Sequence, residues 1–255
     1  MRISWLGHST VLIEVSGVRI LTDPLLRRRF AGLRWAVPRP AVTRNLFRGN
    51  LRVDAVLLSH LHHDHCDLPS LRLLGAPAVV APSGAGRWLR RRRIGGVVET
   101  AVGATVSVGE ASVTAVHAEH HGRREPSGPW AQTVGHLIDT PDAAVWLAGD
   151  TAPHPSFRDL ARSTRRGRLD LAVVPVWGWG PRLGPGHLDP RTAAEAAVQS
   201  GAAHAIPVHW GTLYPAGLLP LMRTRLVSPG PEFARHLAGT GVEAHVLPVG
   251  GRLLL

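Results

Sequence analysis

The sequence contains no lysine, a single cysteine and no long apolar run. With Cys66 alone, an internal disulfide bond is excluded. No apolar stretch approaches the roughly 20 residues that a membrane-spanning helix needs. The N-terminal residues Met1–Trp5 lead into neither the apolar core nor the cleavage site of a secretory leader, so we expect a cytoplasmic protein without a transmembrane segment. All 29 basic residues are arginine, which indicates a codon preference for GC-rich DNA rather than a choice made for one site.

Acidic residues are few, with 18 against 29 basic residues, which gives a formal net charge of +11. This balance is typical of a solvated arginine-rich surface, or of a protein that contacts nucleic acid or an anionic membrane surface. The arginine runs 27–29 and 90–93 fit both explanations. Because net charge is weak evidence, we favour the solvated surface and keep peripheral membrane or nucleic-acid contact as the alternative. An anionic small molecule is the expected substrate type, and the oligomeric state stays open.

Hydrophobic residues make up 44% of the 255-residue chain, which is enough for a large core. Patterns of strand and helix repeat after about residue 130. We therefore predict one domain, residues 1–255, with an α/β (α+β) fold made of two halves, roughly 1–125 and 126–255. The economical arrangement is two mixed β-sheets packed face to face with helices outside, a four-layer αββα sandwich.

Local patterns give the expected elements. Runs rich in branched and aromatic residues predict strands at 2–6, 10–15, 18–21, 54–58, 78–80, 97–99, 104–108, 112–116, 134–139, 143–147, 171–174, 205–208, 246–247 and 252–255. Helices are expected from residue 67 and at 83–93, 157–165, 190–200 and 231–238. Residues 25–52, rich in Arg, Pro and Gly, show little periodicity. They are expected to wall a substrate pocket as a long surface loop, or to form an unstructured insertion.

Residues 60–65, His60-Leu61-His62-His63-Asp64-His65, have the pattern His-x-His-x-Asp-His, whose four named positions can bind metal, directly after the expected strand 54–58. Side chains two residues apart on an extended or tightly turned backbone point the same way, so His60 and His62 can share one ion. Asp64 and His65 can then face a second ion. Imidazole and carboxylate groups suit Zn²⁺, Mn²⁺ or Fe. The motif therefore predicts metal binding.

Three further expected strands are followed at once by residues of ligand type. Strand 112–116 leads into His117-Ala118-Glu119-His120-His121, strand 143–147 leads to Asp150, and strand 205–208 leads to His209. Taken singly, Asp150 fits a turn and His209 fits a buried structural histidine equally well. Together with the first motif, they predict a dinuclear site on the loops at one rim of the sandwich.

These motifs resemble those of the metallo-β-lactamase-fold hydrolases. The first motif of that family matches His60, His62, Asp64 and His65, and its bridging-aspartate motif matches Gly149-Asp150-Thr151. The chain is more similar still to the branch that contains N-acylphosphatidylethanolamine-hydrolysing phospholipase D and the ascorbate-phosphate lactonases. This likeness spans nearly the whole chain and depends on the segments Trp5-Leu6-Gly7-His8-Ser9-Thr10, Leu21-Thr22-Asp23-Pro24, Ala118-Glu119-His120 and Pro207-Val208-His209-Trp210-Gly211-Thr212.

The resemblance implies two divalent cations, most readily Zn²⁺, with Mn²⁺ or Fe as alternatives. A hydroxide shared by the ions would attack phosphorus or a carbonyl carbon. Asp64 and Asp150 would then be catalytic as well as metal-binding, and His121 competes with His120 for one ligand position. The implied ligands are His60, His62 and His120 for the first ion, Asp64, His65 and His209 for the second, and Asp150 as the bridge.

Neighbouring residues each have two interpretations. His187 either protonates a leaving group or holds a phosphate, or else only leads into a helix. Asp67 either orients a ligand imidazole or caps a helix. His8 could reach the site, although a structural hydrogen bond fits it better, and Cys66 fits a packing role.

Two further pairs border the expected pocket. Trp177 and Trp179 follow a strand and are expected to line the pocket with apolar surface, with core packing as the alternative. Arg123 and Arg124 either grip an anionic substrate or are simply solvated.

We therefore expect a dinuclear metal-dependent hydrolase that acts on a phosphodiester, a phosphate-bearing small molecule or a phospholipid. A lactonase or another carboxylic-ester or amide hydrolase is the alternative within the same chemistry. A nuclease, or a nucleic-acid-binding protein without turnover, ranks lower, because the sequence carries no recognisable RNA-binding module.

Overall fold

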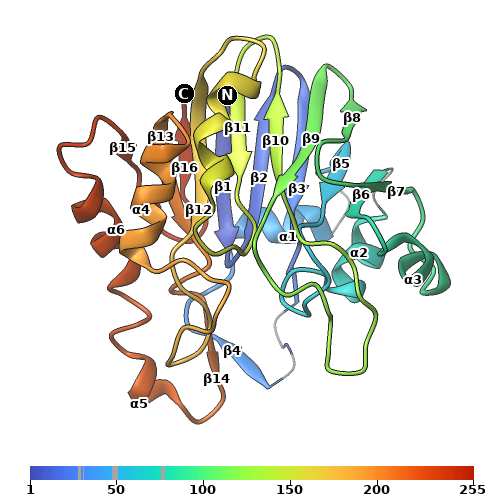
Figure 1. Cartoon of the computed structure of the whole chain (residues 1–255). Coiled ribbons are helices and arrows are strands. Elements are labelled where there is room, and N and C mark those ends of the chain that lie inside the picture. The colour runs from blue at the N-terminus through green and yellow to red at the C-terminus, as the bar shows by residue number, and fades with distance from the viewer. Residues whose placement is uncertain (28–29, 31, 48–50, 76–77) are drawn as a thin grey trace.

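Two mixed β-sheets lie face to face in the computed structural model of the protein, which describes residues 1–27, 30, 32–47, 51–75 and 78–255 (Figure 1). Within these residues, the strand order of the first sheet is β16-β1-β2-β3-β5-β6-β7 and that of the second is β15-β13-β12-β11-β10-β9-β8. The first sheet consists of β1 (Arg2–Gly7), β2 (Thr10–Val15), β3 (Val18–Thr22), β5 (Ala55–Leu57), β6 (Ala78–Pro82), β7 (Val97–Thr100) and β16 (Arg252–Leu254). The second consists of β8 (Thr105–Val108), β9 (Ala111–His117), β10 (Val134–Asp139), β11 (Ala144–Leu147), β12 (Leu169–Pro175), β13 (Ala202–Val208) and β15 (Glu243–Ala244).

The first sheet is apolar on both faces, because successive side chains of its strands point alternately into two different cores. In β2, Val11 and Ile13 belong to the large core that also contains Val113 and Leu137 of the second sheet. Leu12, between them, belongs to a separate core on the opposite face. Both faces of this sheet are therefore covered, one by the second sheet and the other by helices.

Helices form the outer layers. The first sheet is covered by α1 (Ala41–Phe47), α2 (Leu68–Leu74) and α3 (Gly86–Arg91), and Leu46, Leu71 and Leu89 share the core of Leu12. The second sheet is covered by α4 (Pro190–Gln199) and α6 (Pro229–Leu237), whose buried faces join the large core (Figure 1). The layer order helix, sheet, sheet, helix confirms the predicted αββα sandwich. None of the described helices could span a bilayer, since the longest, α4, has 10 residues.

Most expected elements are present, but two of them differ from the prediction. Residues 157–165 form two short 3₁₀ helices, η1 (Pro155–Asp159) and η2 (Ala161–Ser163), rather than one helix. The prediction of a strand at 246–247 is wrong. The chain pairs with β13 only as far as the backbone N–H of His245, which donates to Ala205 O, and then crosses to the first sheet, where Gly250 N donates to Trp5 O.

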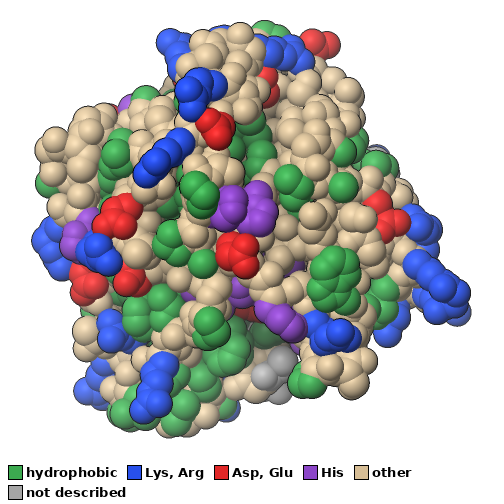
Figure 2. Space-filling model, in the orientation of Figure 1, with side chains coloured by type: hydrophobic (Ala, Val, Ile, Leu, Met, Phe, Trp, Pro, Cys, Tyr) green, Lys and Arg blue, Asp and Glu red, His purple; other side chains and the backbone are tan. Residues whose placement is uncertain are grey.

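The stretch 25–52 is more ordered than its composition predicted. It contains α1 and the strand β4 (Leu33–Trp35), which pairs antiparallel with β14 (Leu213–Pro215). Residues 28–29, 31 and 48–50 of the stretch lie outside the described residues. A short helix, α5 (Leu219–Met222), follows β14. Exposed hydrophobic side chains gather in the lower part of the face in Figure 2, where α5 and β14 lie in Figure 1.

Candidate metal centre

The candidate ligands follow four strands that end at one rim of the two sheets. Residues 59–65 follow β5, His120 follows β9, Asp150 follows β11, and His209 directly follows β13. Strands β5, β11 and β13 are buried at their C-terminal ends, where the candidate ligands follow. Chain segments far apart in sequence are thus brought to one place by sheet topology.

The first group consists of three imidazoles. His60 Nε2 lies 2.9 Å from His62 Nδ1, which lies 3.1 Å from His120 Nε2. Donor atoms around a tetrahedral zinc ion with bonds of ~2.0–2.1 Å are about 3.3 Å apart. The three nitrogens are therefore spaced as the ligands of one ion are.

Hydrogen bonds on the far side of each ring determine which nitrogen carries the proton. His120 Nδ1–H donates to Gly186 O at 2.8 Å, and His62 Nε2–H donates to Arg123 O at 3.1 Å. The hydroxyl of Ser59 already donates to a carboxylate, so it accepts from His60 Nδ1–H at 2.9 Å. Three lone pairs then face one another, an arrangement that only a shared cation makes favourable.

The second group follows the same pattern. His65 Nε2 lies 3.1 Å from His209 Nε2, and Asp64 Oδ2 lies 3.7 and 3.6 Å from these two atoms. The outer nitrogens are again held, because His209 Nδ1–H donates to Trp177 O at 2.9 Å and His65 Nδ1–H donates to Asp23 Oδ2 at 2.8 Å. His209 reaches this position with a left-handed backbone, φ 63°.

Asp150 lies between the two groups. Its Oδ2 is 3.1 Å from His65 Nε2 and 3.4 Å from His209 Nε2. Its Oδ1 is buried and has no hydrogen-bond partner among the described residues. A buried carboxylate oxygen without a partner is costly unless a cation neutralises it, so Asp150 fits the bridging position that the family resemblance implied.

The charges of the site also favour a bound cation. Burial by itself would raise the pKa of Asp64, but the neighbouring imidazoles, His65 first, hold it well below its usual range. Burial would lower the pKa of His65, whereas the carboxylates of Asp150, Asp64 and Asp23 raise it well above the usual value. Without metal, a proton on His65 supplies the positive charge that these carboxylates need, and a bound cation can replace that proton.

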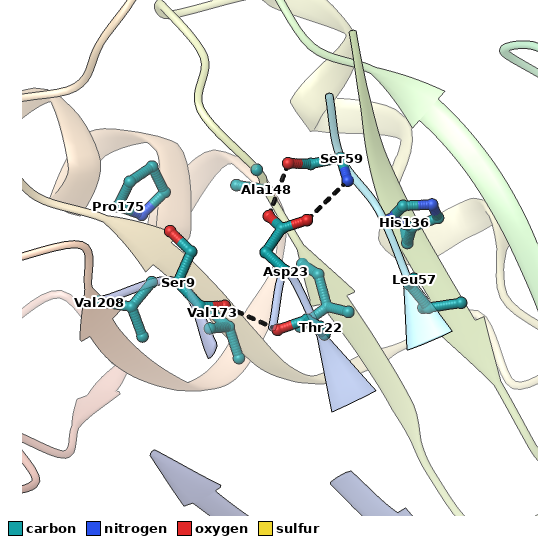
Figure 3. Close-up of a pocket in the computed structure, with 12 residues that line it drawn as sticks. Ser9, Thr22, Asp23, Leu57, Ser59, His136, Ala148, Val173, Pro175 and Val208 are labelled. Carbon is teal, nitrogen blue, oxygen red and sulfur yellow. Dashed lines mark hydrogen bonds between the residues drawn. The ribbon is translucent and has the colours of Figure 1, made fainter. Parts of the chain in front are cut away.

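Two residues that orient the ligands had no role in the sequence analysis. Asp23 is 4% exposed and accepts hydrogen bonds from Ser59 N at 2.8 Å and from Ser59 Oγ at 2.6 Å (Figure 3). Together, Asp23 and Ser59 hold the outer nitrogens of His60 and His65. The signal for Asp23 lay in the segment Leu21-Thr22-Asp23-Pro24, but nothing in its spacing predicted a contact with residues almost forty positions away.

The structure decides between the interpretations of the neighbouring residues. His8 Nε2 lies 2.9 Å from Asp64 Oδ2, so His8 contacts the site. The suggestion that Asp67 orients a ligand imidazole is wrong, because its carboxylate accepts from Ser70 N at the start of α2 and pairs with Arg27. Burial raises the pKa of Cys66 to about 12, which agrees with a packing role.

His120, not His121, is the histidine that joins His60 and His62. The imidazole of His121 is exposed and stacks 6.5 Å from the ring of His62, whereas His120 supplies the third nitrogen of the first group. The roles of these residues as metal ligands are predictions.

A pocket of about 770 Å³ opens over both groups. Its walls combine the apolar side chains Phe30, Leu33 and Trp179 with the ionisable side chains of His62, His63, Asp64, Arg124, Asp150, Arg182, His187 and His209. His187 lies in this pocket with Nε2 3.4 Å from Asp150 Oδ2. The helix that follows His187 is capped instead by Asp189, which forms a capping box with Thr192.

Two expectations about the pocket were wrong. Trp177 is 7% exposed and is not among the pocket-lining residues, and its carbonyl oxygen positions His209. Arg124 lines the pocket but is not solvated. It is 8% exposed, and its guanidinium donates to the carbonyls of Leu61 and Cys66 and to His63 Nδ1, so it fixes the ligand loop. The side chain of Arg123 is exposed.

Comparison with known proteins identifies the family. The model described as the beta-lactamase superfamily domain matches residues 18–210. The chain belongs to the beta-lactamase superfamily. This membership confirms the expected metallo-β-lactamase fold. A UPF0173 metal-dependent hydrolase of Koribacter versatilis is 30% identical over 220 residues, covering 83% of this chain and 85% of that protein.

Other superfamily relatives are longer. An uncharacterised protein of Mycobacterium tuberculosis is 31% identical over 226 residues, covering 83% of this chain and 59% of that protein. The N-acyl-phosphatidylethanolamine-hydrolyzing phospholipase D 1 of Caenorhabditis elegans is 28% identical over 240 residues, covering 84% of this chain and 64% of that protein. The chain thus spans about three fifths of the length of these relatives. Among solved structures, the metallo hydrolase Igni18 of Ignicoccus hospitalis has the same fold, with a TM-score of 0.74, 19% identity and coverage of 99% and 97% of the two chains.

Proposed function

We propose that this member of the superfamily is a dinuclear metal-dependent hydrolase, loaded with zinc. The observation that carries the proposal is the direction of the imidazole lone pairs. In both groups, the outer ring nitrogens donate to fixed acceptors and the inner nitrogens converge at 2.9–3.1 Å. The proposed ligands are His60, His62 and His120 for one cation and Asp64, His65 and His209 for the other, with Asp150 shared.

When bound, two such cations would supply Lewis-acid activation of water and of the scissile group. The protein's own residues would hold and orient this chemistry. Asp23 and Ser59 keep the ligand imidazoles in one tautomer, which is how outer hydrogen bonds tune a metal site. His187 faces Asp150 from the pocket side, and burial would lower its pKa, but the hydrogen bond to Asp150 raises it. A proton on His187 Nε2 is therefore available to a leaving group at this position.

The pocket supports an anionic substrate that also carries apolar groups. Arg182 and His63 offer positive or polar groups at its wall, while Phe30, Leu33 and Trp179 offer apolar surface. A phosphodiester with an apolar substituent meets both demands, and the name of the nematode relative agrees with a phospholipid. A lactone or another carboxylic ester is the alternative, since the same groups can act on a carbonyl carbon.

A nuclease is less well supported. Figure 2 shows arginine side chains in separate places over this face rather than gathered in one continuous patch. A nucleic-acid-binding surface would require a contiguous basic stripe. Contact with membranes or nucleic acid, and a cytoplasmic location, stay predictions.

The test combines metal analysis with a substrate screen. We expect two zinc ions per chain in the purified protein, and hydrolysis of bis-p-nitrophenyl phosphate that chelation abolishes. His62→Ala should lose zinc and activity, whereas the matched change His121→Ala should keep both. Lactone and RNA substrates at the same metal loading separate the alternatives. Unchanged zinc content and turnover in His62→Ala would refute the proposed site.

A further inference from the structure

A second kind of donor cluster lies at the edge of the second sheet. Strands β13 and β15 are parallel, and their register pairs His204 with Glu243. His245 follows β15 by one residue, and its backbone N–H donates to Ala205 O at 2.8 Å, which continues the pairing. Side chains two apart on an extended strand share a face, so Glu243 and His245 project together beside His204.

The donor atoms of these side chains converge. His204 Nδ1 lies 3.1 Å from His245 Nε2, and the two oxygens of Glu243 divide between the rings, at 3.3 Å from His204 Nδ1 and 3.8 Å from His245 Nε2. All three atoms lie within 4.8 Å of one another. These separations bracket the roughly 3.3 Å expected between ligands of a tetrahedral zinc ion with bonds of ~2.0–2.1 Å.

A simple hydrogen-bonded cluster explains the arrangement less well. The side chain of Glu243 is 65% exposed, and an ion pair between exposed groups contributes only about 0–1 kcal/mol. Such a weak interaction gives little reason for a long, mobile side chain to point both oxygens at two imidazoles. Two histidines and one glutamate are, by contrast, a known protein ligand set for zinc, which leaves one coordination position open to water.

The cluster is separate from the candidate catalytic centre. His204 lies on β13, five residues before His209, which corresponds to roughly 16 Å along an extended strand at ~3.3 Å per residue. None of its residues belongs to the donor groups of the centre.

We propose that His204, Glu243 and His245 form an additional binding site for a divalent transition metal, zinc or one of similar ligand preference. The cation joins β15, an edge strand of two residues, to β13. It thereby secures the point where the chain leaves the second sheet on its way to β16 in the first sheet. The site is structural rather than catalytic.

Calorimetric titration with zinc tests the proposal on protein whose catalytic centre alone is loaded. After the catalytic centre is loaded and free metal removed, the wild-type protein should bind one further equivalent. His204→Gln and His245→Gln should each weaken this binding by at least about tenfold, the lower end of what even indirect changes around metal ligands cause. His236→Gln is the matched control, because His236 is exposed on α6 and belongs to no donor group of the described residues.

Two readouts distinguish loss of the site from loss of the fold. All variants should keep the zinc content of the catalytic centre and the turnover of the wild-type protein. Excess zinc should raise the Tm of the wild-type protein and of His236→Gln, but not of His204→Gln. The proposal is overturned if the loaded wild-type protein takes up no further zinc, or if the variants take it up as tightly as His236→Gln does.

Discussion

Replacing Asp23 by asparagine tests whether hydrogen bonds to the outer ring nitrogens orient the ligand histidines. The carboxylate of Asp23 accepts from Ser59 N, Ser59 Oγ and His65 Nδ1, at 2.6–2.8 Å. Asparagine has nearly the same shape but turns one acceptor oxygen into a donor. Whichever way the amide lies, its NH₂ group faces a donor that it cannot satisfy, so His65 or Ser59 must turn.

The magnitude follows from the contacts. A buried donor left without an acceptor costs about 1–3 kcal/mol, so Asp23→Asn should destabilise the protein by that amount. Loss of an outer hydrogen bond typically weakens metal binding by about 10–100-fold, equivalent to roughly 1.4–2.7 kcal/mol. The effect should be larger for the ion of His65, which contacts Asp23 directly, than for the ion of His60, which contacts it through Ser59.

Competition with a chromogenic chelator measures the two zinc affinities separately. Asp54→Asn is the matched control, because the carboxylate of Asp54 also accepts a backbone hydrogen bond, from Arg19 N at 2.7 Å, but far from the site. The control should bind both ions as the wild-type protein does. If Asp23→Asn changes neither affinity by more than about threefold, the orienting role assigned to Asp23 is wrong.

Three further changes have distinct expected outcomes. Arg124→Gln should destabilise the protein by about 2–4 kcal/mol in denaturant titrations, because it leaves buried carbonyls of the ligand loop unpaired. Arg123→Gln should be nearly neutral, because the side chain of Arg123 is exposed and donates to Gly128 O, and equal effects of the two changes would contradict this reasoning. His187→Gln should keep its zinc and slow turnover about 10²–10⁴-fold for esters with poor leaving groups, but far less for p-nitrophenyl esters; an equal loss for both would exclude proton donation. Burial lowers the pKa of His136 to about 4, so the unfolded chain binds the extra proton and stability falls as the pH drops from about 6.5 to 4. In metal-free protein, His136→Leu should remove about 2–3 kcal/mol of the stability difference between pH 7.5 and 4.5, and an unchanged difference would show that His136 does not titrate this way.

Much of the fold and of the candidate site could be predicted from the sequence because the signals were local. Each of the four ligand segments combines an apolar strand with an adjacent His or Asp, and parallel strands of one sheet end at the same edge. The side chains of His60, His62 and Asp150 therefore meet as their positions implied. The prediction of a strand at 246–247 was wrong because it depended on a distant contact: residues 243–245 pair with β13, and the apolar residues that follow cross to the first sheet.

The outer hydrogen bonds could not be predicted, because they depend on contacts between segments that no spacing connects. Asp67 lies two residues from His65 and was the natural candidate to orient it, yet helix capping and Arg27 occupy its carboxylate. Asp23 takes this role because β3 and β5 are neighbours, which brings the end of one strand beside the start of the ligand loop. The carbonyl of Trp177 and the buried guanidinium of Arg124 act through similar long-range contacts.

A crystal structure with anomalous scattering data collected on both sides of the zinc absorption edge tests the central claim most directly. We predict two strong peaks under the pocket. One should lie among the inner nitrogens of His60, His62 and His120, and the other among Asp64, His65 and His209, with Asp150 between them. A map from zinc-replete crystals with no peak at these positions would contradict the claim that the converging imidazoles form a metal centre.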